Sequence, residues 1–136
     1  MFRNSRTDTQ LDIRLVYEER TGDIIFLIGT ILEIVSAYQA EDSILSKLYI
    51  IKSSDNSAYT IATASWLFLI ASIIFAHVAI VRLVELGKNK STLNSTIKSS
   101  QIVTTGNMIK AVGFGLAAIG NQIKVSTLGN TIAISQ

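Results

Sequence analysis

The fold is decided by the segment Ala64–Val81, ASWLFLIASIIFAHVAIV, which contains no formally charged residue, no glycine and no proline. Extended to Ile61–Val84, it would form a helix of about 36 Å. A helix of that length and composition is long enough to cross the hydrocarbon region of a bilayer. The rest of the chain is therefore expected to be arranged so that this helix is removed from water.

The composition of the 136-residue chain points to a membrane or to a tightly self-associating subunit. Hydrophobic residues make up 49% of it and charged residues 16%, whereas ordinary globular chains have about 25% charged residues. The mean hydropathy is +0.42. The absence of proline allows long helices, and the absence of cysteine excludes disulfides and thiolate metal sites. A net charge of +2 is too small to indicate nucleic-acid binding.

The chain before this segment predicts a polar tail followed by shorter helices. Residues 1–9 form the tail, and the N-terminal region is too polar for a secretory signal. The apolar residues of Gln10–Arg20 alternate as in a strand, but they are also spaced as in a helix, and we favour a short helix that ends at Gly22. A second helix is predicted over 24–38, with Asp23 as its N-cap.

One face of the 24–38 helix is mixed in character and therefore requires a partner. It comprises Phe26, Gly29, Thr30, Glu33 and Ser36. Glu41 and Asp42 then interrupt the apolar pattern, which resumes over 43–51.

The predicted fold is all-α and forms a single helical domain over 1–136. Its centre is an apolar region over 24–87, folded as a long helical hairpin of about 24–51 and 58–87. The polar loop KSSDNSAY joins the two arms. A third, amphipathic helix is expected over about 92–126.

Glycines recur every seven residues in this third helix, at Gly106, Gly113 and Gly120. A seam with alternating spacings of three and four accompanies them over 102–126: Ile102, Thr105, Ile109, Val112, Leu116, Ile119 and Ile123. Each glycine lies beside the seam and allows another helix to come close.

The opposite face of the third helix carries Asn107, Lys110, Phe114, Ala117, Asn121 and Lys124. A face this polar argues against a single helix surrounded by lipid. We therefore expect an amphipathic helix that packs on the hairpin or on another copy of the chain. The alternative is a low-complexity segment that is not helical.

The motif Gly-Asn-x-Ile occurs three times near the C-terminus, within GNMIKAVG, GLAAIGNQI and GNTIAIS. Through these motifs, residues 102–134 resemble small repetitive Gly-Asn and Ala-Ile-Gly proteins of unknown function from spore-forming bacilli. The resemblance implies a bacterial source and a structural or membrane-associated role. It supplies no catalytic residue.

The sequence predicts no catalytic, cofactor or metal site, because no convergent set of polar residues is present. The single histidine, His77, lies in the apolar segment, where a satisfied polar residue between packed helices is the commoner outcome. Because an intramembrane carboxylate is usually paired, Glu33 is a candidate for a buried polar contact with His77 or Arg82 across the hairpin.

Two functions follow from these observations. The first is a non-enzymatic, membrane-embedded protein that self-associates as an oligomer or scaffold, or permeabilises the membrane as holins do. Its basic residues would place the N-terminus and the segment Lys88–Lys98 in the cytoplasm. The alternative is a structural subunit of a filament, tube or crystal, spore-associated or extracellular, that buries its apolar helices between copies. The expected partners are other copies and a lipid bilayer, with no nucleic acid and no small-molecule substrate.

Overall fold

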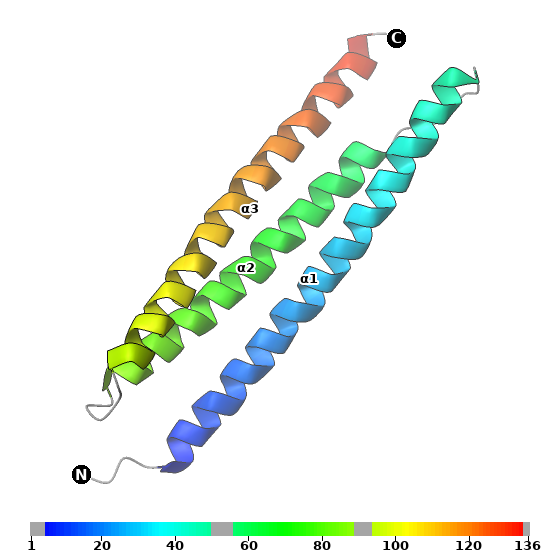
Figure 1. The fold of residues 1–136 in the computed structure, drawn as a ribbon. Helices are drawn as coiled ribbons and strands as arrows, with labels where there is room; N and C mark the ends of the chain where they lie inside the picture. The colour runs from blue at the N-terminus through cyan, green and yellow to red at the C-terminus, as the bar shows by residue number, and fades with distance from the viewer. Residues whose placement is uncertain (1–4, 50–55, 89–93, 135–136) are drawn as a thin grey trace.

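The computed structural model contains three long antiparallel helices and describes residues 5–49, 56–88 and 94–134. They are α1 (Ser5–Leu48), α2 (Ser57–Lys88) and α3 (Asn94–Ile134). Their lengths are about 66, 48 and 62 Å, from the rise of an α-helix. The central helix, α2, packs against both of the others (Figure 1). The predicted all-α fold is confirmed.

The predicted breaks in the first half of the chain are wrong, because α1 runs without interruption from Ser5 to Leu48. Gly22 does not end a helix, and Glu41 and Asp42 lie inside one. A glycine within a helix costs about 1 kcal/mol relative to alanine, and at Gly22 it provides space for a packing partner from α2. The third helix also extends past the predicted end at residue 126 into the Gly-Asn segment.

The contact between α1 and α2 is a heptad of small residues. Buried positions recur every seven residues along α1: Leu15, Gly22, Gly29, Ser36 and Ser43. A methyl group on Gly22 would lie 2.8 Å from Cε1 of Phe75, and one on Gly29 would lie 2.9 Å from Cε1 of Phe68. Both glycines therefore form notches that receive aromatic rings of α2.

Two hydrogen bonds from side-chain hydroxyls join the two helices along this contact. Ser36 Oγ donates a hydrogen bond to the backbone oxygen of Ser57 at 2.9 Å, and Thr60 Oγ1 donates one to Gln39 Oε1 at 2.7 Å. Ser36 and Gly29 belong to the mixed face, and their burial confirms that this face packs against a partner. Glu33, from the same face, is exposed.

The third helix turns its small and polar residues toward α2. The inward positions again follow spacings of three and four: Thr104, Asn107, Ala111, Phe114, Ala118, Asn121 and Val125. Asn121 Nδ2 donates a hydrogen bond to Ser65 Oγ at 2.7 Å, and Thr104 Oγ1 donates one to the backbone oxygen of Ala79 at 3.3 Å. The helix thus packs on the hairpin through much of the face that the sequence indicated as polar.

The predicted apolar seam of α3 faces away from α2. Every seam residue from Ile102 to Ile123 is exposed. No atom lies within 4 Å of a methyl group built on Gly106, Gly113 or Gly120. Among the described residues this seam therefore does not pack on the hairpin, and contact with another copy stays a prediction.

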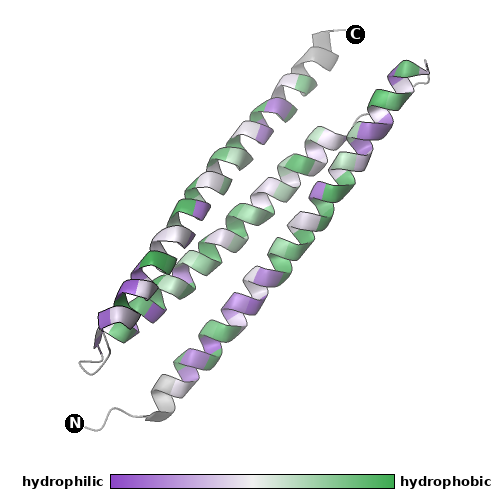
Figure 2. Ribbon diagram, in the orientation of Figure 1, coloured by the Kyte–Doolittle hydropathy of each residue, from purple (hydrophilic) through white to green (hydrophobic). Residues whose placement is uncertain are grey.

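A cluster of three aromatic rings links all three helices at their centre. The ring of Phe68 lies 4.7 Å from that of Phe26 and 5.3 Å from that of Phe114, measured between centroids. Most of the other buried residues of α2 are alanine or serine. Hydrophilic residues of α1 are concentrated in its N-terminal half (Figure 2).

Candidate membrane-spanning surface and its polar sites

Each of the three helices is long and apolar enough to cross a membrane. The qualifying stretches are Thr9–Leu48, Ser57–Lys88 and Asn94–Leu128. An 18-residue segment within the second stretch has a mean hydropathy of 2.5, against 1.5 and 1.4 for such segments of the other two. The sequence pointed to α2 in this role and indicated that the third helix was too polar to be surrounded by lipid on its own.

Large aliphatic side chains lie on the outside of the bundle, while small residues lie between the helices. Leu27 on α1 is 59% exposed, and Ile109 and Leu116 on α3 are 66% and 67% exposed. The buried set is dominated by alanine and serine, such as Ala64, Ser65 and Ala71. This distribution is the reverse of that in a water-soluble bundle, and it is typical of helices that pack through small residues in lipid.

Tyrosines mark two levels along the bundle. Tyr38 on α1 and Tyr59 on α2 lie at the same level, because neighbouring residues of the two helices are hydrogen-bonded there. Both are exposed, as is Tyr17 on α1. Tyr17 and Tyr38 are about 32 Å apart along α1, a separation that fits within the roughly 40–45 Å of a bilayer with its headgroup regions. Tyrosine is enriched at membrane interfaces.

Each of the three helices has a charged residue at one end of a charge-free stretch, and the three side chains reach one cavity. Asp23 precedes a charge-free stretch of α1, Arg82 follows that of α2, and Lys110 precedes that of α3. These three residues line one cavity, together with Glu19 and Asn107. All three helices therefore contribute a charged side chain to this cavity.

Two carboxylates of α1 pair with the basic residues of α2. Arg82 donates to both oxygens of Glu19, with Nη2 2.6 Å from Oε2 and Nη1 3.2 Å from Oε1. The adjacent residue, Glu18, accepts a hydrogen bond from Arg14 Nε at 2.9 Å. Its other oxygen lies 3.5 Å from His77 Nε2, an ion pair only when the imidazole is protonated.

The expected contact of Glu33 with His77 or Arg82 is not formed, because the structure brings the two basic residues to Glu18 and Glu19 instead. Glu33 lies between Gly29 and Ser36, which face the N-terminal half of α2. His77 and Arg82 lie toward the other end of that helix. Glu18 and Glu19 were not predicted as partners of these residues, because their sequence indicated a separate short helix.

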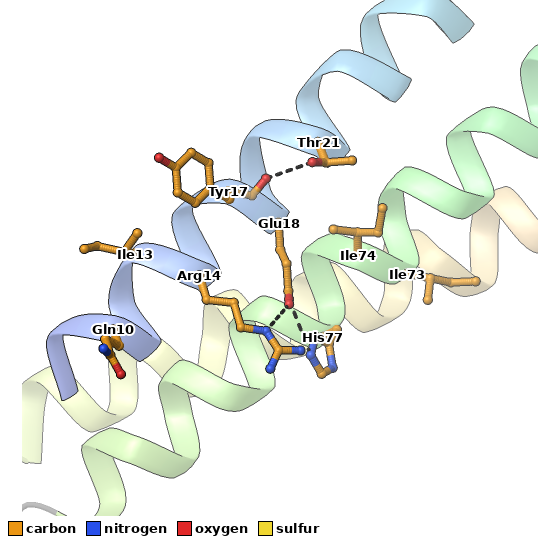
Figure 3. Close-up of a pocket in the computed structure, with 9 residues that line it drawn as sticks. All are labelled: Gln10, Ile13, Arg14, Tyr17, Glu18, Thr21, Ile73, Ile74 and His77. Atoms are coloured by element: carbon orange, nitrogen blue, oxygen red, sulfur yellow. Dashed lines mark hydrogen bonds and ion pairs between the residues drawn. The ribbon is translucent and has the colours of Figure 1, made fainter. Parts of the chain in front are cut away.

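A groove of about 700 Å³ lies between α1 and α2 beside Glu18. Figure 3 shows Glu18 between Arg14 and His77, with Ile73 and Ile74 of α2 forming an apolar side. Among the residues that the structure describes, no group of three His, Cys, Asp or Glu side chains could hold a metal ion. The groove is thus an apolar surface with one charged edge.

Comparison with known proteins yields no match. No family model matches the chain, and neither the curated proteins nor the solved structures contain a significant relative. The function must therefore be argued from the structure itself.

Proposed function

We propose that this protein is a non-enzymatic integral membrane protein with three spanning helices that self-associates into an oligomer or scaffold. The observation that carries the proposal is the reversed distribution of side-chain size. Small residues fill the contacts between helices, and large aliphatic residues cover the outside. In water such a surface would be an aggregation hazard, whereas in lipid it is solvated.

The proposed orientation places the N-terminus in the cytoplasm. The N-terminal end of α1, the C-terminal end of α2 and the N-terminal end of α3 lie at one end of the bundle (Figure 1). Four arginines precede residue 24, and four basic residues lie within 82–101. An excess of lysine and arginine favours the cytoplasmic side.

The proposed contact between copies is the outward seam of α3. Its glycines are unobstructed, and its apolar residues keep coiled-coil spacing over about three heptads. Within the chain, glycines with the same spacing on α1 receive aromatic rings of α2. The same arrangement between two copies would bring their α3 helices close together.

Liposome flotation tests the membrane proposal. The purified chain, reconstituted from detergent into vesicles, should float with the lipid and resist extraction by alkaline carbonate. A chain that stays in the dense fractions and sediments as a large particle without lipid would contradict the proposal and favour a soluble assembly subunit.

Release of an entrapped dye from the same vesicles separates a holin-like role, which predicts leakage, from a scaffold, which predicts intact vesicles.

A further inference from the structure

A small cavity between the three helices contains charged and polar side chains that have no part in the proposed scaffold role. Its volume is about 330 Å³, at the low end of small-molecule sites, which span roughly 300–1,000 Å³. Glu19 and Asp23 come from α1, Phe75 and Arg82 from α2, and Asn107 and Lys110 from α3. All three helices therefore contribute side chains to it.

The cavity lies beside a charged residue that bounds a charge-free stretch on each helix. From Asp23 the next charge along α1 is Glu33, and from Lys110 the next along α3 is Lys124. Arg82 is the first formal charge after the long apolar segment of α2. If the helices span a bilayer, as proposed above, this level is the boundary between hydrocarbon and headgroups.

One acidic and one basic side chain of the cavity are available to bind a ligand. Glu19 and Arg82 neutralise each other through their two-pronged contact. Asp23 and Lys110 form no hydrogen bond or ion pair within the part of the chain that the structure describes. A ligand that satisfies both must itself carry a negative and a positive group.

We propose that this cavity binds the headgroup of a phospholipid with a primary ammonium group, of the phosphatidylethanolamine type. The phosphate oxygens accept hydrogen bonds from Lys110 and the Asn107 amide, and the ammonium donates to the Asp23 carboxylate. A choline headgroup has no N–H donor for Asp23. A glycerol headgroup carries no cation and leaves that carboxylate unpaired.

Binding of lipids with identical acyl chains and different headgroups tests the proposal by native mass spectrometry of the detergent-solubilised full chain. The wild type should bind the ethanolamine lipid about tenfold more tightly than the choline lipid, the loss expected when a charge-assisted hydrogen bond is removed. Asp23→Asn and Lys110→Met should each abolish the preference. Lys124→Met removes a lysine of the same helix that does not line the cavity, and it should keep the preference.

Stepwise N-methylation of the ethanolamine lipid provides a test on the wild type alone, which stays informative even if a variant fails to fold. Affinity should fall most at the last methylation, which removes the remaining N–H donor. Equal affinity along this series, or stronger binding of the glycerol lipid, would overturn the proposal. Full competition by inorganic phosphate would also overturn it and indicate a general anion site. A chain that floats with vesicles but shows no headgroup preference contradicts only this inference, whereas failure to float contradicts the membrane proposal as well.

Discussion

Glycine recurs at seven-residue spacing in two helices of this protein, with opposite consequences. On α1, Gly22 and Gly29 accept the rings of Phe75 and Phe68. On α3, the corresponding notches at Gly106, Gly113 and Gly120 face outward and are empty. The comparison shows that a glycine heptad marks a surface suited to close approach, while the identity of its partner depends on how the chain is folded.

The two glycine heptads should differ most in their effect on stability when leucine replaces one glycine of each. The glycine on α1 contacts an aromatic ring, and the glycine on α3 does not. We expect Gly29→Leu to destabilise the bundle by about 3 kcal/mol, because even its first carbon would lie 2.9 Å from the Phe68 ring. Gly113→Leu should leave the single chain as stable or slightly more stable, since leucine is the better helix former. Unfolding in detergent micelles, followed by circular dichroism, measures both. Equal losses of stability in the two variants would contradict the difference between the two heptads.

Cysteine cross-linking tests whether the open heptad meets a second copy. The natural chain has no cysteine, so a single introduced thiol reports only its own position. Leu116→Cys lies on the exposed seam and should give a disulfide-linked dimer in vesicles under mild oxidation. Ala118→Cys, two residues away and fully buried, is the matched control and should stay monomeric. Absence of dimer at Leu116 and at its seam neighbour Val112 would contradict self-association through α3.

The smallest expected effect concerns the carboxylates of α1. Glu19→Gln should cost about 1 kcal/mol, because its pair with Arg82 is two-pronged but partly exposed. Glu33→Gln should change the stability of the solubilised chain by less than about 0.5 kcal/mol, since Glu33 is exposed and is not brought to His77 or Arg82. A double-mutant cycle of Glu19 with Arg82 isolates the pair. If Glu33→Gln lowers the stability more than Glu19→Gln does, the result would support the contact of Glu33 with His77 or Arg82 that was expected from the sequence.

Helix content was largely predictable from sequence, and the choice of packing faces was not. The apolar run from Ala64 to Val81 identified α2 directly, and the regular spacing around Gly113 identified α3. Gly22 was mistaken for a helix end because glycine is common at that position, and only the ring of Phe75 explains its place inside α1. Local sequence does not contain that long-range contact.

The outward seam of α3 was the harder feature to place. Periodicity separated its two faces correctly, but the choice of the buried face followed the rule for water, in which the apolar face packs inward. The structure buries Thr104, Ala118 and Asn121 wholly or partly and exposes Leu116. Lipid removes the hydrophobic drive between helices, so small and polar residues become the better contacts. The candidate headgroup cavity was equally hidden, since it depends on the register of three helices.

Fluorescence of Trp66 tests the central claim most directly. It is the single tryptophan of the chain, and its side chain is 41% exposed. It lies about 10 Å along α2 from Tyr59, the residue that marks the proposed membrane interface. In reconstituted vesicles, lipids brominated in the middle of their acyl chains should quench its emission more strongly than lipids brominated near the headgroup, and acrylamide in the water should quench it weakly. Efficient quenching by acrylamide, with no effect of either brominated lipid, would show that Trp66 faces water and would contradict the account.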